Sequence, residues 1–356
     1  MWDVDNTTPF PHAQTFLRDA EGRSLWVVGV KATLAFRPGR ACLFVPDQVP
    51  VHHGPVFAED DTQSDLLADT DITLPKDQVD VTVDATAYPP RDVRVEQPYL
   101  AQISVGPMNK PVQIAPPSML SRWQGVTPIK DATPDPVPLR YSSAFGGERT
   151  GDNPIGLGDD PRAERETTPM PRLSLPGKPL QNPKFPVPPV ALNAIPRSWP
   201  ARDALSGTYD AEWQRRRSPL LPTDLQSEFW QAAPPDQRLD RAALSGAHVT
   251  LTNMTSSDGA WADPPVSFAL PFVGFGIRTQ FRGQWCPLAP ELQTIHIAAN
   301  ARLISLFYLA TLPIEAGKND VLVGSTIISL EDSSGFRVQP EHAGSFERTA
   351  QLEEAV

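Results

Sequence analysis

The sequence contains little cysteine and no long apolar run. Two of its 356 residues are cysteines, Cys42 and Cys286, and they form no C-x-x-C pair. Sparse, widely separated thiols do not indicate a disulfide framework and fit a reducing compartment. The most apolar stretch, LISLFYLATLP at 303–313, is too short to span a bilayer. The N-terminus lacks the basic start and apolar run of a secretory signal. We therefore expect a cytoplasmic protein with no membrane partner.

Positive charge is also in short supply. The chain has 31 lysines and arginines against 42 aspartates and glutamates, a formal net charge of −11. Nucleic-acid binding needs a basic surface, so we expect no nucleic-acid partner. The negative field is compatible with ordinary solubility or with a basic protein partner.

Familiar catalytic and metal-binding patterns are absent. The six histidines show no H-x-x-x-H, H-E-x-x-H or Cys/His zinc spacing, and no G-x-S-x-G is present. Asp80 and Asp84 would lie on one strand face about 13 Å apart. Glycosidase carboxylates lie about 5–9.5 Å apart, so we interpret this as a solvated face. The sequence predicts no enzyme, no catalytic residue, no cofactor and no metal site.

An acidic run and a basic cluster remain open to two interpretations each. The acidic run is a solvated loop, or it binds a cation or a basic surface. The basic cluster in EWQRRRSPLLP (212–222) is a solvated helix end or pairs internally, or it meets a partner's carboxylates. The residues concerned are Asp60, Asp61, Asp65, Asp69, Asp71, Arg215, Arg216 and Arg217.

Proline is abundant, with 41 residues against 22 glycines. Proline fixes φ and removes a donor, which disfavours long helices and central strands. Alternation of apolar and polar residues nevertheless predicts strands, most clearly at 24–36 and 78–90. Further strands are expected at 39–50, 93–107, 246–254, 266–271, 275–283, 294–310 and 321–330. The segment 223–239 is predicted to be a helix that Pro234-Pro235 ends.

These elements predict a mainly β fold, with a β-sandwich-like antiparallel core, a long proline-rich ordered wrap and one or two short helices. We expect a single domain, 1–356. Its parts are an N-terminal β part (1–105), a proline- and glycine-rich wrap (106–222), and a short helix with a C-terminal β part (223–356). Prolines recur through 106–200, so that stretch is either extended chain packed over a sheet or a polyproline segment for a partner.

The segment YSSAFGGERTGDNPIGLG (141–158) looks like a binding loop. A phosphate cradle would need a lysine and a following helix, and both are missing here. Its acids are not in the order of a calcium loop. We therefore predict a conformational role, with glycines at φ > 0 and Asn153 held off the helical region by Pro154.

Three strings together resemble one family. They lie in QSDLLADTDITLPKDQVDVTVDATAYPP (63–90), VPLRYSSAFGGERTGDNPIGLG (137–158) and TYDAEWQRRRSPLLPTDLQSEFWQAAPPDQRL (208–239), followed by FALP (268–271). The pattern is similar to that of bacterial adaptor proteins catalogued as a domain of unknown function, whose genes lie beside type VI secretion spike (VgrG) and PAAR tip genes. This chain departs from it at Asp84, usually glycine, and at Trp230, usually asparagine.

The resemblance implies a non-enzymatic adaptor or chaperone that binds a secreted effector through its PAAR-bearing or N-terminal region and helps load it onto the VgrG spike. Its structural or partner-binding candidates here are Asp65, Lys76, Asp80, Tyr141, Phe145, Gly146, Gly147, Asn153, Pro154, Gly156, Asp224, Phe229 and Pro234. The alternative is a carbohydrate-active or other hydrolase that uses acids of 59–84 and 148–160. A third possibility is a secreted structural component of the spike.

Overall fold

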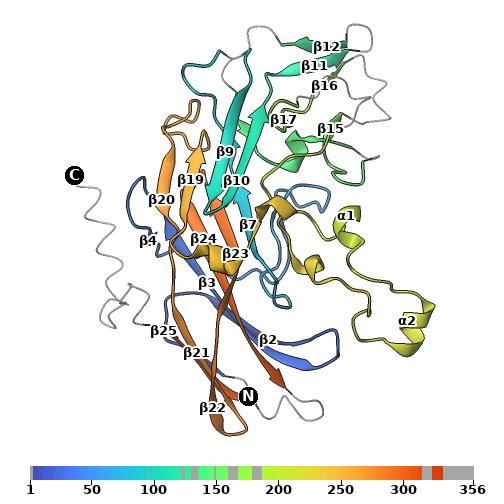
Figure 1. Cartoon of the computed structure of the whole chain (residues 1–356), viewed down its shortest axis with the longest axis vertical. Coiled ribbons are helices and arrows are strands. Elements are labelled where there is room, and N and C mark those ends of the chain that lie inside the picture. The colour runs from blue at the N-terminus through green and yellow to red at the C-terminus, as the bar shows by residue number, and fades with distance from the viewer. Residues whose placement is uncertain are drawn as a thin grey trace.

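The computed structural model describes residues 3–94, 96–121, 125–129, 135–147, 150–158, 167–178, 187–314 and 323–331. These residues form an elongated, mainly β molecule built from several sheets (Figure 1). The prediction of a mainly β fold is confirmed. Most strand pairs are antiparallel. Parallel pairs join β7 (Val79–Asp84) to β23 (Glu291–Ala298), β1 (Val4–Asn6) to β25 (Val323–Leu330) and β14 (Phe145–Gly146) to β15 (Leu157–Gly158).

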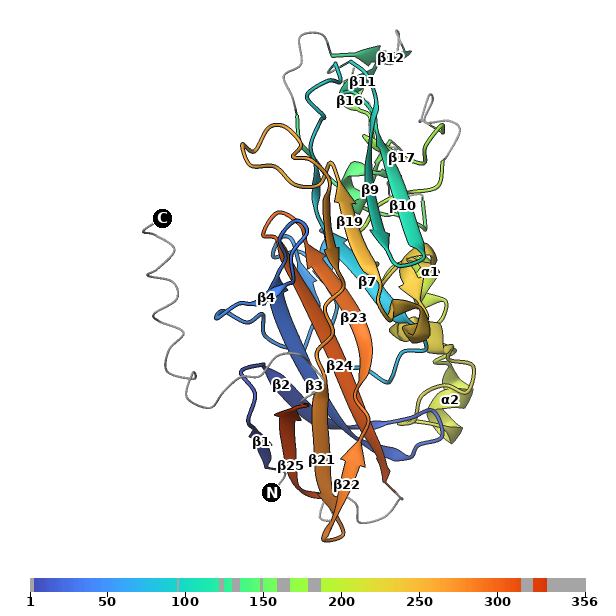
Figure 2. The ribbon, with the colours of Figure 1, turned by 60° about the vertical axis from the view of Figure 1, so that its left-hand side comes forward.

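The largest sheet, called the main sheet here, takes strands from both ends of the chain. Its order is β18 (Arg238–Leu239), β7 (Val79–Asp84), β23 (Glu291–Ala298), β24 (Leu303–Ile314), β3 (Ser24–Ala35) and β2 (His12–Arg18), and β4 (Leu43–Phe44) also pairs with β3. The N-terminal and C-terminal β parts of the sequence are therefore interleaved in one sheet. Figure 2 shows β3 and β24 running side by side along the molecule.

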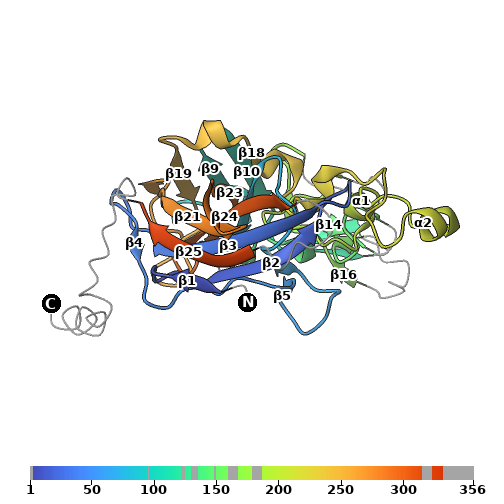
Figure 3. The same cartoon turned by 90° about the horizontal axis from the view of Figure 1, so that it is seen from below.

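Two smaller sheets pack against one face of the main sheet. The first has five antiparallel strands, β17 (Leu173–Ser174), β10 (Met108–Ile114), β9 (Tyr99–Val105), β19 (His248–Thr252) and β20 (Val266–Ala269). The second has four, β1 (Val4–Asn6), β25 (Val323–Leu330), β21 (Phe275–Phe281) and β22 (Gln284–Leu288). The end-on view of Figure 3 shows β9, β10 and β19 on one side of the molecule and β2 and β3 on the other.

One apolar core joins these layers, as expected for a sandwich. In β7 the side chains of Val79, Val81 and Val83 are fully buried in this core, as the alternation predicted. Phe36, at the end of β3, stacks on Phe268 of β20 with ring centroids 4.5 Å apart. The sheets are thus held together by face-to-face burial of apolar side chains, the dominant favourable term in folding.

The second face of the main sheet is also covered, and this corrects one expectation. Asp80, which the sequence placed on a solvated face, has no exposed surface. Lys31 and Thr33 of β3 are buried on the same face. The cover comes from chain segments of the first 76 residues, from the wrap and from residues 231 and 232 after it, which alternation within one strand does not reveal.

The remaining strands are short. A three-stranded sheet of β12 (Gly125–Pro128), β11 (Ser118–Ser121) and β16 (Thr167–Pro169) lies at one end of the long axis, and the β21–β22 hairpin lies at the other (Figures 1 and 2). The two-stranded pairs are β5 (Val56–Phe57) with β6 (Leu66–Ala68), β8 (Thr86–Ala87) with β13 (Val137–Pro138), and β14 (Phe145–Gly146) with β15 (Leu157–Gly158). The predicted strands at 39–50 and 93–107 are much shorter than expected, since the first retains only β4 and the second only β9. The predicted strand at 294–310 is instead divided by a turn at 299–302 between β23 and β24.

The described part of the segment 106–222 contains strands and helices as well as irregular chain, and its first residues belong to a sheet and not to a wrap. Residues 108–114 form β10, an interior strand of the five-stranded sheet, and 173–174 form β17 at its edge. Two short α-helices follow, α1 (Pro200–Asp203) and α2 (Ala211–Arg216). Asp210 caps α2 by accepting from the Trp213 N–H. Helix α2 lies on an arm that projects from the body of the molecule (Figures 1 and 2).

The predicted helix over 223–239 is wrong. This segment contains two 3₁₀-helical turns, Ser227–Trp230 and Pro235–Gln237, separated by extended backbone. The Ala232 N–H donates to Asp80 of β7 at 2.8 Å, so the chain is held extended against the main sheet. Other 3₁₀-helical turns lie at Tyr141–Ser143 and Arg241–Leu244.

Two smaller expectations concern helices and thiols. Among the described residues, neither α-helix has the length and apolarity that crossing a bilayer requires. The two cysteines are free, Cys42 buried and Cys286 half-buried. Burial raises the pKa of the Cys42 thiol to about 11, which keeps it protonated and unreactive at neutral pH.

Candidate functional site

The three sequence strings meet on the second face of the main sheet. Their polar side chains, together with Asn193 between the second and third strings, make three neighbouring groups of buried hydrogen bonds, which together we call the polar network. It comprises Asp65, Lys76, Asp80, Asn153, Asn193, Gln231 and Gln237. Buried polar groups are costly unless they are hydrogen-bonded, so these bonds favour one arrangement of the segments that they join. Among the described residues one oxygen of the network, Asn153 Oδ1, has no hydrogen-bond partner.

Asp65 and Asn193 connect the first two strings. The Asp65 carboxylate accepts from the Ser142 N–H at 3.1 Å and from the Asn193 side-chain amide at 3.3 Å. The Asn193 side-chain oxygen accepts from the Tyr141 N–H at 3.2 Å. Asp65 is therefore a structural acceptor and not part of a solvated acidic loop.

Asn153 holds the glycine-rich loop closed on itself. Its side-chain amide donates to the carbonyl oxygens of Tyr141 at 2.8 Å and Phe145 at 2.9 Å. A Cβ on Gly146 would lie 2.2 Å from the Asn153 carbonyl oxygen, and one on Gly156 would lie 2.3 Å from its side-chain nitrogen. A side chain at either position would overlap Asn153, so both positions need glycine. The positive φ that the sequence predicted occurs instead at Gly147 (142°) and Gly158 (108°).

Lys76 and Asp80 form a buried ion pair with a separation of 2.7 Å. The Lys76 ammonium also donates to the Thr294 hydroxyl at 2.9 Å, and Asp80 accepts from the Ala232 N–H. The Gln231 side chain lies 3.3 Å from the same carboxylate. The first and third strings are thus joined across the end of the main sheet.

The third string contributes both buried and exposed residues. The Gln237 amide donates to the carbonyl oxygens of Val81 at 2.7 Å and Leu192 at 3.0 Å, and Pro234 is buried beside it. Phe229 is half-buried, with the Arg202 guanidinium 5.9 Å from its ring centre. Asp224 is exposed and accepts from the N–H and hydroxyl of Thr208.

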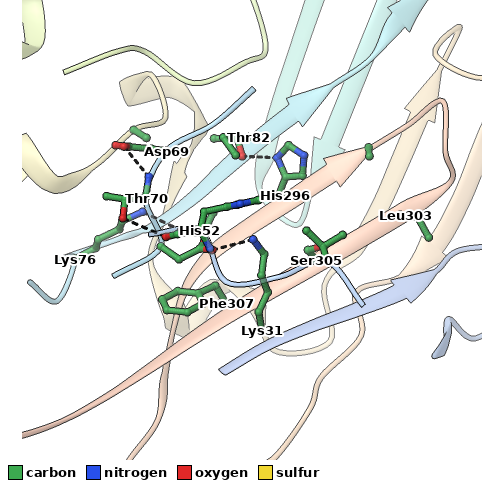
Figure 4. Close-up of a pocket in the computed structure, with 16 residues that line it drawn as sticks. Lys31, His52, Asp69, Thr70, Lys76, Thr82, His296, Leu303, Ser305 and Phe307 are labelled. Atoms are coloured by element: carbon green, nitrogen blue, oxygen red, sulfur yellow. Dashed lines mark hydrogen bonds and ion pairs between the residues drawn. The ribbon is translucent and has the colours of Figure 1, made fainter. Parts of the chain in front are cut away.

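A polar cavity of about 120 Å³ adjoins the network (Figure 4). Lys31 of β3, His296 of β23 and Ser305 of β24 reach it from the sheet, and His52 and Thr70 reach it from the covering chain. Figure 4 shows His52 and His296 beside one another, between Lys31 and Thr82. A cavity of this size and polarity has room for a few water molecules.

The charges around this cavity are balanced in pairs. The Lys31 ammonium lies 2.8 Å from the Asp71 carboxylate. The same carboxylate also accepts from the backbone N–H of His52 at 2.7 Å. The pKa of His296 is lowered to about 4, chiefly by burial and further by the nearby Lys31 ammonium. Burial likewise lowers the pKa of His52. Both imidazoles are therefore neutral at pH 7.

The described acids of 59–84 do not form a free carboxylate pair. Burial acts to raise the pKa of Asp69, but Arg202 at 2.7 Å and Arg197 at 3.3 Å outweigh it and hold the pKa below its usual range. Asp71 is paired with Lys31, while Asp60 and Asp61 are exposed. The prediction that the acidic run is a solvated loop is therefore correct only for Asp60 and Asp61. Glu148, Asp159 and Asp160 of the hydrolase hypothesis lie outside the described residues.

Most of the candidates named from the sequence are interior. Those that are buried are Asp65, Lys76, Asp80, Tyr141, Phe145, Gly146, Gly147, Asn153 and Pro234. Pro154 and Gly156 are half-buried in the glycine-rich loop. The side chains of the buried set have no surface left for a partner, so the geometry favours a structural role for them.

Several members of this region have no counterpart in the sequence prediction. Asn193 and Arg202 lie in or just after the proline-rich stretch, and both are buried. A lone asparagine in the apolar context VALNAIP was a usable signal for Asn193. For Lys31, His52 and His296 the single-strand patterns held no comparable signal, because they meet only when three elements come together.

A family model, described as an uncharacterized protein conserved in bacteria (DUF2169), matches residues 21–308. The chain belongs to this family. The match includes all three strings and every residue of the polar network. Neither the comparison with curated proteins nor that with solved structures found a match.

Proposed function

We propose that this protein is an adaptor that binds a type VI secretion effector, by its PAAR-bearing or N-terminal region, and helps load it onto the VgrG spike. The assignment to secretion comes from the resemblance of the three strings. The observation that supports the proposal most is that residues of those strings lie in the buried polar network, which holds the wrap against the main sheet. A binding protein needs such a preorganised surface and no covalent chemistry.

The hydrolase hypothesis has less support. A hydrolase of the two-carboxylate type needs one carboxyl group that retains a proton near neutral pH. Asp69 and Asp71 line the cavity, but each contacts a basic side chain, and the pKa of Asp69 lies below its usual range. Asp69 therefore does not have the raised pKa that a general acid needs, and Asp71 is held by Lys31 and the backbone N–H of His52.

The end of the molecule at the β11–β12–β16 sheet is our candidate for the effector surface. Within the described part of 106–200, Val126 and Ile129 are the large apolar side chains that are exposed. Val126 lies in β12, an edge strand of that sheet, and Ile129 directly follows this strand. Exposed apolar residues on an outlying sheet are typical of protein interaction sites.

Co-purification tests the proposal. The tagged chain would be expressed with the products of its immediate gene neighbours, and we expect a toxin or tip protein to elute with it in stoichiometric amount. A double variant, Val126→Asp with Ile129→Asp, should lose this partner while remaining folded. Trp285→Asp is the matched control, since Trp285 is exposed in β22 at the opposite end of the molecule.

The outcomes separate the parts of the proposal. If no neighbour co-purifies with the unaltered chain, the adaptor function is wrong. If a neighbour binds and the double variant binds it equally well, the adaptor function stands and the effector surface lies elsewhere. If the chain itself accumulates in culture supernatant, a secreted spike component explains the protein better than a loading adaptor.

A further inference from the structure

Two imidazoles and an ammonium group meet where two short runs of chain, residues 48–52 and 70–74, lie on the main sheet. We call these two runs the covering runs. His296 reaches the polar cavity from β23 and Lys31 reaches it from β3, while His52 belongs to the covering runs. Figure 4 shows the two imidazoles beside one another. Both histidines are half-buried and line the cavity, so the contact between the covering runs and the sheet contains two groups that mild acid can charge.

The covering runs are bonded to each other and form one unit. The Asp71 N–H donates to the His52 carbonyl oxygen at 2.9 Å, and the Asp71 carboxylate accepts from the His52 N–H at 2.7 Å. The Thr70 hydroxyl donates to the same carbonyl oxygen at 3.2 Å. Whatever loosens one run from the sheet therefore loosens the other.

Polar bonds attach this unit to β3. The Lys31 ammonium lies 2.8 Å from the Asp71 carboxylate and donates to the Pro50 carbonyl oxygen at 3.2 Å. The Gln48 side chain accepts from the Thr33 N–H at 2.7 Å and donates to the Thr33 carbonyl oxygen at 2.9 Å. Lys31 is thus the charged centre of the attachment, and a second positive charge beside it would weaken the attachment.

Apolar contact with the sheet is limited to a few side chains of the covering runs. Val51 is buried, and Ile72 and Leu74 pack in the same cluster as Phe307 and Leu309 of β24. Because the other contacts at the cavity are polar, the balance between an attached and a detached unit is sensitive to charge.

The charged groups that face the imidazoles are already paired with one another. The pairs are Lys31 with Asp71, Lys76 with Asp80, Arg140 with Asp84, and both Arg197 and Arg202 with Asp69. From β24 the cavity receives only uncharged side chains. Among the described residues, an imidazolium at His52 or His296 would therefore meet the Lys31 ammonium with no free carboxylate to balance the added charge.

The direction of the pH effect follows from this arrangement. Burial and the Lys31 ammonium both lower the pKa of His52 and His296 while the runs are attached. A detached unit removes both causes, so the detached state binds protons that the attached state excludes. Above about pH 6.5 neither state is protonated and pH has no effect, whereas below it the detached state gains population.

We propose that the covering runs are an acid-sensitive switch, attached to β3 at neutral pH and detached from it when His52 and His296 are protonated beside Lys31. Detachment opens the polar cavity to solvent and uncovers the apolar cluster that contains Phe307. The chain between the two runs stays attached to the wrap through Asp65 and Asp69, so the opening is local. The switch does not depend on the adaptor function.

Hydrogen–deuterium exchange of the full chain, followed by mass spectrometry, tests the switch. Two amides bond across the contact, since the Thr33 N–H donates to Gln48 and the Val49 N–H donates to the Thr33 hydroxyl. After correction for intrinsic rates, protection of peptides that contain these amides should fall about thirtyfold from about pH 7.5 to about pH 5. That is the effect of one imidazole whose pKa changes from about 4 to 6.5 on opening. Peptides of β10 should keep their protection.

The double variant His52→Asn with His296→Asn identifies the titrating groups, because asparagine can hydrogen-bond but cannot be protonated. It should keep its protection in acid, and its protection at neutral pH shows whether it folds as the unaltered chain does. His52→Asn alone is the milder variant, at a half-buried position, and should lose less protection than the unaltered chain. His248→Asn is the matched control, since His248 is exposed in β19 and should leave the acid effect intact.

Three outcomes contradict the switch. An equal loss of protection in β10 would mean that acid loosens the whole fold. A full acid effect in the histidine variants would mean that another group, such as Asp71, is the one that titrates. Unchanged protection of Thr33 and Val49 in acid would mean that the covering runs stay attached when the imidazoles are charged.

Discussion

The ammonium of Lys76 and the carboxylate of Asp80 lie 2.7 Å apart, with side chains that are 3% and 0% exposed. Removing one partner of such a pair leaves a buried charge without compensation, which is far more costly than losing an exposed pair. The pair also carries bonds to β23 and to the extended segment at Ala232. It is thus a junction of three chain segments as well as an ion pair.

The first prediction follows from this junction. Asp80→Asn should lower the free energy of unfolding by about 3–5 kcal/mol, because Lys76 would stay buried without its counter-charge. Asp84→Asn on the same strand is the control, since Asp84 and Arg140 are each about a quarter exposed and should lose less than about 1 kcal/mol. Urea denaturation measures both variants. Equal losses of unfolding free energy in the two variants would show that the buried pair stabilises the protein no more than the partly exposed pair does.

The second prediction concerns space in the glycine-rich loop. Gly146→Ala should destabilise the protein by about 1–3 kcal/mol, because the new methyl group would overlap the Asn153 backbone. In Gly151→Ala the nearest atom to the new group is 3.6 Å away on Pro200, and φ is ordinary, so this variant should be neutral or slightly stabilising. Thermal unfolding of the two variants side by side is the measurement. A neutral Gly146→Ala would contradict the steric explanation.

The third prediction concerns Asn193. Its replacement by alanine leaves the Tyr141 N–H and the Leu66 carbonyl oxygen without this partner and takes one donor from Asp65. Buried unsatisfied groups cost about 1–3 kcal/mol each, so Asn193→Ala should lose at least 2 kcal/mol or so. Asn109→Ala, at an exposed position of β10, should change stability by less than about 0.5 kcal/mol. Chemical denaturation distinguishes the two, and a loss no greater than in the control would remove Asn193 from the network.

The fourth prediction concerns pH. The pKa of His296 is about 4 in the folded protein, below the ordinary value of 6.5, so the unfolded chain binds more protons between these values. The stability that neutral His296 contributes is therefore present above about pH 6.5 and falls as the pH drops toward 4. Asn can keep the hydrogen bond to Thr82 but does not titrate, so His296→Asn should flatten this part of the stability curve. Parallel curves for both proteins would show that His296 is not responsible.

The sequence predicted the interior of the sheets well, for a local reason. In β7 the alternation of valines with polar residues is a property of the strand itself, and it identified the core face correctly. The polar face was not predictable in the same way. Asp80 is buried by residues 231 and 232, about 150 positions later in the chain, and no local pattern encodes that contact.

The wrong prediction of a helix over 223–239 has the same cause, a contact between distant parts of the chain. Leu225, Phe229 and Trp230 have helical spacing, and Pro234-Pro235 is a typical stop. The long-range bonds of Gln231 and Ala232 to Asp80 favour extended backbone there and outweigh the local preference. The glycine-rich loop was interpreted correctly as a self-supporting structure, but the need for Gly146 and Gly156 to lie against Asn153 depends on a packed geometry that spacing does not reveal.

The pairing of β7 with β23 has a consequence for how the protein is made. On the ribosome, β3 and β7 emerge more than two hundred residues before β23 and β24, the strands that lie between them in the main sheet. Until β23 and β24 have been synthesised, β3 has only β2 and β4 as partners in the main sheet, and β7 has only β18. The apolar faces of β3 and β7 therefore stay incompletely covered until β23 and β24 have been synthesised, and completion of the main sheet depends on strands that come late in the order of its elements.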